Sequence, residues 1–122
     1  MRKTFALNTA RMTQMVAQAR IDASVISEVR MIPADFGFRA LFDPHSRLFD
    51  PKLAGGALLD IGIYPLAFAV LLLGEPEDIA SLASLGTTQV DEQSGYLLRH
   101  KGGALSVLAS ALRTQTSMSA WV

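Results

Sequence analysis

Two reactive side chains, Asp60 and Tyr64, lie four residues apart in the otherwise apolar segment 55–65. Residues four apart share one face of an α-helix. A carboxylate beside a phenol can hold a hydroxylated substrate and exchange a proton with it, whereas a purely structural helix has little use for the carboxylate. The segment therefore predicts a site for a substrate that carries a hydroxyl group.

Three glycines accompany these side chains. Gly55 and Gly56 precede the predicted helix, and Gly62 lies between the carboxylate and the phenol. Glycine lets a backbone come close to a ligand and leaves space where a side chain would stand. The pattern predicts the wall of a pocket, with room at Gly62 for a substrate.

Each reactive residue also has a structural interpretation. A partly buried aspartate often only accepts hydrogen bonds, and a tyrosine on an apolar helix commonly anchors the core with its hydroxyl at the rim. A phenol ionises near pH ~10 when unaided, so acid/base work at neutral pH needs a neighbouring cation. Lys3 is the candidate cation if the fold brings it close to Tyr64.

Other polar residues are assigned to the surface. His45 and His100 lie far apart, and no acidic residue completes a metal-ligand spacing around either, so no metal is predicted. Arg39 and Arg47 flank a long loop and could bind a substrate oxygen, but they are expected to face solvent and stay outside the catalytic set. The absence of cysteine excludes disulfides, a thiol nucleophile and a cysteine zinc site.

Composition favours one folded domain. The chain has 122 residues, half of them hydrophobic, and 11 basic residues balance 11 acidic ones. No basic run indicates nucleic acid, so a small neutral or anionic ligand fits better. The acidic residues of segment 75–92, Asp91 among them, are expected to form a solvated face. No secretory signal is evident, and the expected location is the cytoplasm.

The most apolar window, residues 57–73, approaches the length of a membrane span. Asp60 and Pro65 argue against insertion, and a buried core helix is expected. This helix should end at Gly74 and be kinked or divided at Pro65.

The remaining elements indicate strands around that helix. A helix is predicted over residues 9–20, capped by Asn8 and preceded by an extended segment. A strand is predicted over 28–38 with Pro33 at an edge position or a bulge, followed by an ordered surface loop. Three further strands, the last two joined by a glycine hairpin, make a meander with one helix across it. They are predicted over residues 79–85, 89–100 and 104–112.

Segment 55–65 reads GGALLDIGIYP, and in this it resembles the substrate domain of the Gfo/Idh/MocA oxidoreductases, above all the dihydrodiol dehydrogenase and D-xylose dehydrogenase branch. The similarity covers most of residues 27–116. Further matching motifs lie at residues 28–30, 34–38, 42–44, 74–76, 87–93 and 102–103.

The resemblance implies a fold and an activity. Family members join a Rossmann domain to an α+β domain with a mostly antiparallel sheet that has helices packed on one face. They transfer hydride between NAD(P) and a sugar, polyol or diol hydroxyl. By this resemblance Tyr64 is the acid/base residue, Asp60 binds the substrate hydroxyl, and Lys3 matches the lysine of a Glu-Lys-Pro motif, although Arg2 and Thr4 depart from it.

The resemblance also implies that much of the family's architecture is missing. Residues 1–20 match only the end of a Rossmann domain, and residues 27–122 match part of the substrate domain. No Gly-x-Gly-x-x-Gly motif occurs, so the cofactor-binding residues are unknown and this chain alone is expected to bind no NAD or NADP and to be inactive. Two alternatives remain: a non-catalytic module that forms a homodimer through its sheet, or a degenerate product without a role.

Overall fold

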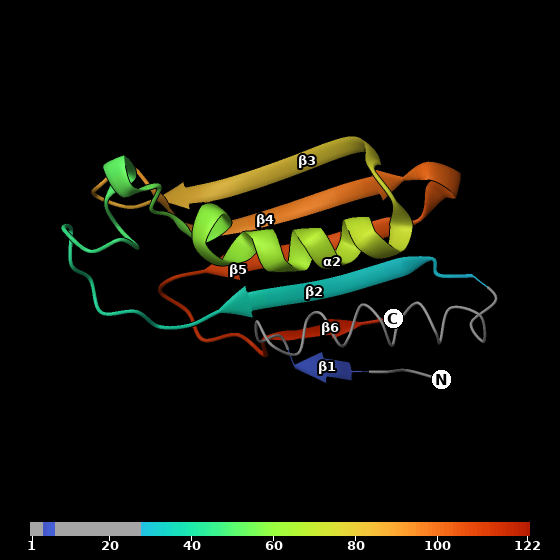
Figure 1. Cartoon of the computed structure of the whole chain (residues 1–122), viewed down its shortest axis with the longest axis horizontal. Helices are drawn as coiled ribbons and strands as arrows, with labels where there is room; N and C mark the ends of the chain where they lie inside the picture. Colours follow the sequence, from blue (N-terminus) through green and yellow to red (C-terminus); the bar gives the residue numbers. More distant parts are fainter. Residues whose placement is uncertain (1–3, 7–27) are drawn as a thin grey trace.

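The computed structural model describes residues 4–6 and 28–122, with side chains from residue 28 onward. These residues form a six-stranded sheet with one long helix on one face (Figure 1), so the predicted α+β class is confirmed. The order across the sheet is β1-β6-β2-β5-β4-β3. The strands are β1 (Thr4–Ala6), β2 (Met31–Gly37), β3 (Pro76–Leu85), β4 (Asp91–His100), β5 (Leu105–Ala111) and β6 (Ser119–Trp121).

The predicted meander is confirmed. Strands β3, β4 and β5 pair antiparallel in chain order, close to the bounds expected from alternating hydrophobic residues. The β4–β5 connection is the short 3-10 turn Lys101–Gly103. Gly102 and Gly103 have φ values of 81° and 87°, which L side chains rarely adopt, and this explains the glycine pair in the hairpin.

Strand β2 differs from the prediction in its position. It pairs in parallel with β5 over its whole length, without a bulge, and β6 pairs with its other side at Ala34. The prediction that Pro33 marks an edge position or a bulge was therefore wrong. Pro33 is tolerated in this interior strand because β6 is short, and its only partner on β2 is Ala34.

The helix begins with a π-helical turn, Leu58–Gly62, and continues as α2, Ile63–Leu73. Gly74 ends it, with a φ of 79° and its N–H bonded to the carbonyl of Val70, as predicted. The helical segment is divided, as predicted, but the division lies between Gly62 and Ile63, where π-helical geometry changes to α-helical geometry, and not at Pro65. Pro65 lies in the first turn of α2, where a missing N–H is least costly.

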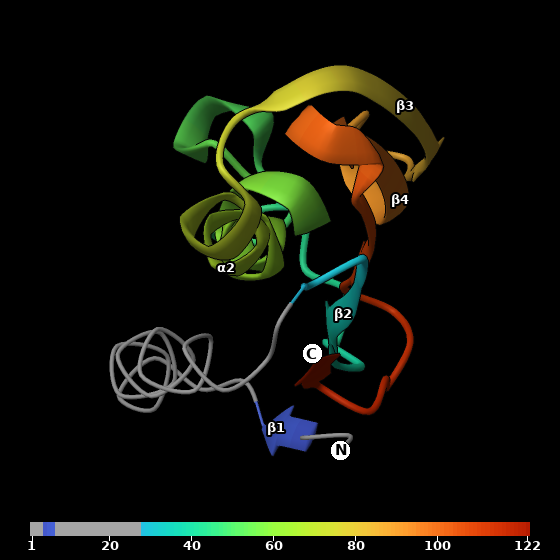
Figure 2. The same cartoon turned by 90° about the vertical axis from the view of Figure 1, so that its right-hand side faces the viewer.

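The core lies between α2 and the sheet. Figure 2 shows α2 covering one face of the sheet. Phe68 and Ala69 of α2 are fully buried in a cluster with residues from β2, β4 and β5. Segment Pro51–Leu73 is long and apolar enough to cross a membrane by length and composition, with a mean hydropathy of 2.1 over an 18-residue window, and in this fold its inner side packs on the sheet.

His100 corrects a second prediction. It is fully buried rather than on the surface, whereas His45 is exposed as expected. One ring nitrogen of His100 is 2.8 Å from the carbonyl oxygen of Gly74, and the other is 2.7 Å from the hydroxyl of Ser106. The imidazole thus links the end of α2 to β5, which is a structural role.

The predicted helix at residues 9–20, and the extended segment before it apart from Thr4–Ala6, lie outside the described residues. The described part is strand β1, which pairs with β6.

Candidate active site

Asp60 lies in the π-helical turn at the start of the helix. Its side chain is only 9% exposed, and its carboxylate forms an ion pair with Arg47, whose own side chain is 72% exposed. Exposed ion pairs contribute little, but a nearly buried carboxylate needs a partner. Arg47 and Arg39 are both exposed, as expected from the sequence, but Arg47 also pairs with Asp60, which the sequence did not indicate.

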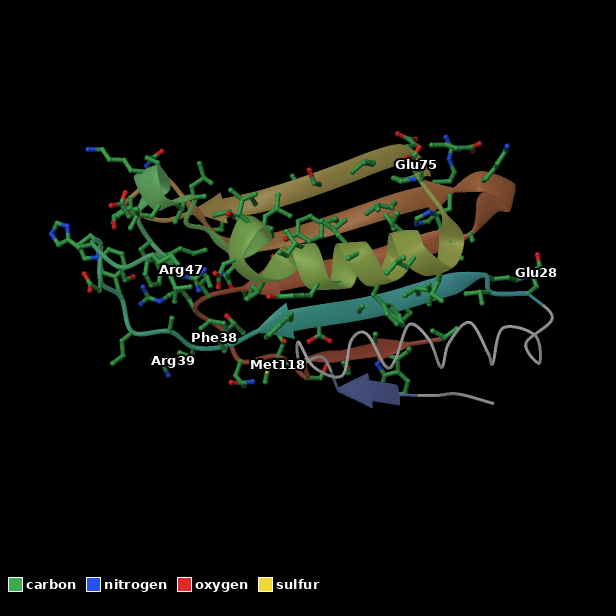
Figure 3. All side chains as sticks on the ribbon, in the orientation of Figure 1. Glu28, Phe38, Arg39, Arg47, Glu75 and Met118 are labelled. Carbon is green, nitrogen blue, oxygen red and sulfur yellow. The ribbon has the colours of Figure 1, made fainter. Side chains whose placement is uncertain are left out.

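Arg47 reaches Asp60 from the surface loop between β2 and the helix. Phe49 anchors that loop, since it is fully buried and its ring meets the ring of Phe42 at 5.1 Å. The guanidinium of Arg113 lies 5.7 Å from the centre of the Phe42 ring. The loop is ordered, as predicted, and it holds the ion pair at the end of the sheet where Figure 3 places Phe38 and Arg47.

Tyr64 is half-buried in the first turn of α2. Its ring packs on Phe36 of β2, with ring centres 5.6 Å apart, and it borders the smaller core cluster around Phe49. In the part of the chain that the structure describes, the Tyr64 hydroxyl has no hydrogen-bond partner. The phenol is therefore held by its ring while its oxygen stays available.

Asp60 and Tyr64 both face the chain that runs from β2 into the loop, because one contacts Arg47 and the other contacts Phe36. That the two side chains share one side of the helix stays a prediction. The third predicted residue, Lys3, lies outside the described residues.

The glycines have a different explanation from the one expected. A Cβ at Gly55 would lie 2.8 Å from the carbonyl oxygens of Leu48 and Asp50. A Cβ at Gly62 would lie 2.7 Å from the Tyr96 hydroxyl and 3.0 Å from that of Ser110. Protein atoms fill the space predicted for a substrate at Gly62, so this glycine allows close packing of the helix on β4 and β5.

Tyr96 and Ser110 form a buried polar pair beneath the π-helical turn. Their hydroxyls are hydrogen-bonded, and both residues are at most 6% exposed. Burial raises the pKa of Tyr96 above its ordinary value of 10.0; hydrogen bonds to Ser110 and Ser94 oppose the rise, and the charge of Asp91 adds to it.

Substituting Gly62 should expose this packing. We expect Gly62→Ala to destabilise the chain by about 1–3 kcal/mol, because the new methyl group overlaps the Tyr96 hydroxyl. Tyr96→Phe removes that hydroxyl, so the two substitutions together should cost less than the sum of their separate effects. Urea unfolding of the four variants measures the coupling, and simple additivity would contradict the contact.

The burial of the Tyr96 phenol should make the stability of the chain depend on pH in the alkaline range. Unfolded Tyr96 ionises near pH 10.0, while the folded chain retains the proton to higher pH. Above that pH the folded state binds more protons than the unfolded state, so stability falls as pH rises. We expect the stability difference between the unsubstituted chain and Tyr96→Phe to shrink above pH 10.0, and a constant difference would be the opposite result. Urea unfolding below and above this pH measures it.

A cavity of about 430 Å³ opens between the helix start and the β3–β4 hairpin. Its walls are mostly apolar and include Leu58 and Leu82, with Asp91 and Ser94 among its polar groups. Asp60 and Tyr64 are not part of its lining. The candidate site is therefore distinct from this cavity, and its contacts are to Arg47 and Phe36.

The described residues include polar groups that suit a hydroxylated ligand. No group of three or more His, Asp or Glu side chains within them is arranged to hold a metal ion. No glycine-rich phosphate-binding turn occurs in the sequence. Asp60 offers a hydrogen-bond acceptor and Arg47 offers donors to a hydroxyl, and the Tyr64 phenol is a group that can exchange a proton.

Comparison with known proteins places the chain in a family. The sequence model of the GFO/IDH/MocA C-terminal domain matches residues 15–122. The chain belongs to the GFO/IDH/MocA family. The resemblance seen in the sequence is thereby confirmed for the C-terminal domain.

Curated GFO/IDH/MocA relatives include trans-1,2-dihydrobenzene-1,2-diol dehydrogenases. The protein from Xenopus tropicalis is 29% identical over 136 residues, covering 90% of this chain and 41% of the relative. The human protein is 29% identical over 146 residues, covering 98% of this chain and 43% of the relative. The chain thus spans less than half the length of these relatives. Both alignments are longer than the chain, so these relatives contain residues that it lacks.

Solved structures agree on the GFO/IDH/MocA fold. An aldose-aldose oxidoreductase from Caulobacter crescentus, complexed with glycerol, is 29% identical, with a TM-score of 0.71 over 88% of this chain and 33% of that protein. A levoglucosan dehydrogenase complexed with NADH and L-sorbose is 20% identical, with a TM-score of 0.72 over 88% of this chain and 34% of that protein. The second likeness shows the fold alone.

Sequence reasoning missed two site residues. Arg47 was set aside because an arginine in a loop usually faces solvent. Asp91 was assigned to a solvated acidic face, yet its carboxylate accepts a hydrogen bond from the first residue of the helix. The signal for Asp91 was its position directly after buried Val90 at the start of a strand.

Proposed function

We propose that this chain is the substrate-binding part of an NAD(P)-dependent oxidoreductase that transfers hydride between a nicotinamide and the hydroxyl-bearing carbon of a sugar, polyol or dihydrodiol. The observation that supports it is the nearly buried Asp60 carboxylate and the half-buried Tyr64 phenol, four residues apart at the start of one helical segment. The dehydrogenase relatives give the reaction class.

The proposed roles follow from the contacts. Asp60 accepts a hydrogen bond from the substrate hydroxyl, and Arg47 keeps the carboxylate oriented. Tyr64 takes the hydroxyl proton when the alcohol is oxidised and returns it in the reverse direction. Lys3, as the matching family lysine, lowers the cost of the phenolate by its positive charge.

The 122 residues contain no dinucleotide-binding Gly-x-Gly-x-x-Gly turn. Holding a nicotinamide within reach of the substrate carbon requires a phosphate-binding turn, and the sequence has none. We propose that the chain alone neither binds NAD(P)H nor turns over. Titration of NADH and NADPH fluorescence with the purified chain tests this, and saturable binding would contradict it.

A joined enzyme tests the oxidoreductase proposal. This joined enzyme is a fusion protein in which the nucleotide-binding domain of a family dehydrogenase is followed by this chain. We expect it to reduce NAD or NADP with at least one polyol, aldose or dihydrodiol, followed by NAD(P)H absorbance. A folded joined enzyme that binds cofactor but oxidises no member of such a panel would count against the proposal.

A second proposal is that the open face of the sheet forms a homodimer. The side chains of Leu97 and Val107 point away from α2, are paired across β4 and β5, and are 45% and 43% exposed. Met31 and Leu82 are more than half exposed as well. Exposed apolar surface of this kind favours association.

Light scattering tests the dimer. The chain should have the mass of two copies, and Val107→Lys should return it to one copy with the same circular dichroism spectrum. A single-copy mass for the unsubstituted chain at all concentrations would contradict the proposal.

A further inference from the structure

The helix that holds Asp60 and Tyr64 lacks a cap of its own. Ala57 precedes its first turn and makes no side-chain hydrogen bond to the helix. The first N–H groups of a helix need acceptors, and a negative charge is favourable there. The acceptor comes from far along the chain: the N–H of Leu58 donates to Oδ2 of Asp91, 33 residues away, at 2.8 Å.

Asp91 is itself fixed in place. The hydroxyl of Ser94 donates to the same carboxylate oxygen at 2.5 Å, within strand β4. Val90, immediately before Asp91, is buried in the smaller core cluster. The cap is therefore a rigid point of the sheet rather than a free surface carboxylate.

Gly56 shows how closely the two segments approach. A Cβ at this position would overlap Oδ1 of Asp91, and its φ of 119° is one that L side chains rarely adopt. Its carbonyl accepts the N–H of Asp60 at 3.1 Å. One oxygen of Asp91 thus lies against Gly56 while the other binds Leu58.

We propose that Asp91 is a positioning residue that sets the start of the helix, and with it the direction of the Asp60 and Tyr64 side chains. The inference rests on the proposed function for what these two side chains do. Asp60 follows Leu58 by two residues, so rotation of the first turn would turn its carboxylate away from Arg47.

Amide hydrogen exchange of the whole chain tests the contact. In Asp91→Ala we expect the Leu58 amide to exchange at least tenfold faster, with the amides of Leu98 and Leu108 unchanged. Asp91→Asn should give an intermediate rate, because its amide oxygen can still accept. An unchanged Leu58 rate, or equal acceleration throughout the sheet, would overturn the proposal.

The matched control is Glu92→Gln, at the next position of the same strand. Glu92 pairs with Arg113 at 3.7 Å instead of binding the helix. It should leave the Leu58 rate unchanged, and acceleration as large as in Asp91→Ala would overturn the proposal. Should Asp91→Ala fail to fold, Ser94→Ala provides the milder test, because Asp91 remains but loses its fixing hydrogen bond. It should raise the Leu58 rate to a smaller extent, and an unchanged rate would overturn the proposal.

Kinetic measurements on the joined enzyme distinguish a positioning role of Asp91 from an effect of Asp91 on the stability of the fold. We expect Asp91→Ala to lower kcat at least tenfold at a temperature where the protein stays folded, Asp91→Asn to recover part of it, and Glu92→Gln to change it less than twofold. A normal kcat in Asp91→Ala would overturn the positioning role. If the unsubstituted joined enzyme shows no turnover that depends on Tyr64, the proposed function is wrong, and the exchange rates still decide whether Asp91 holds the helix.

Discussion

In the joined enzyme, Tyr64→Phe is expected to lower kcat about 10²–10⁴-fold, because it removes the group proposed to exchange the substrate proton. A hundredfold loss corresponds to about 2.7 kcal/mol in the barrier. The phenylalanine keeps the ring packed on Phe36. Stability should therefore change little, and KM should change less than kcat, because Asp60 still holds the substrate hydroxyl.

The control is the chain's other tyrosine. Tyr96→Phe also deletes one phenolic oxygen, but from a hydroxyl buried against Ser110 beneath the helix. We expect it to alter stability and to change kcat less than tenfold. Normal turnover in Tyr64→Phe would refute the acid/base role of Tyr64, and equal losses in both variants would show that the effect is structural.

The second large effect concerns stability. Leu98→Ala should destabilise the chain by about 2–5 kcal/mol, since Leu98 is 1% exposed and its truncation leaves a cavity in the core shared with Phe68 and Leu108. A domain of this size is stabilised by on the order of 10 kcal/mol in total. Urea unfolding followed by circular dichroism measures the change.

Leu41→Ala is the matched control, because Leu41 is 94% exposed in the loop after β2. It should change stability by less than about 0.5 kcal/mol. Equal effects at both leucines would contradict the described core. Absence of a cooperative transition in the unsubstituted chain would favour the alternative that the chain is a degenerate product without a role.

Much of the fold follows from local patterns. Alternation in β4 and β5, the glycine pair at 102–103 and the stop at Gly74 predict the meander and the helix end, because each depends on neighbours in the sequence. The position of Pro33 could not be derived in this way. Its strand is interior because β5 and β6 come from the far end of the chain.

The candidate site was predictable in its residue types but not in its supports. Asp60 and Tyr64 are conspicuous because polar groups are rare in an apolar helix. The reason for Gly62, the burial of His100 and the pairing of Arg47 depend on contacts between distant segments. Such contacts cannot be inferred from a single sequence. Three assignments stay predictions. They are the Rossmann remnant at residues 1–20, the partial substrate domain at residues 27–122, and the role of Lys3 in proton transfer.

The parallel pairing of β2 with β5 has a consequence for how the molecule is made. Met31 is aligned with Leu105, so the whole β3–β4 hairpin and the helix lie in the closed loop between them. Contacts of such long sequence separation form slowly, and antiparallel neighbours can form first. During synthesis on the ribosome, β2 therefore cannot pair with β5 until almost the entire domain has emerged. Until then β2 is an exposed apolar segment to which chaperones can bind.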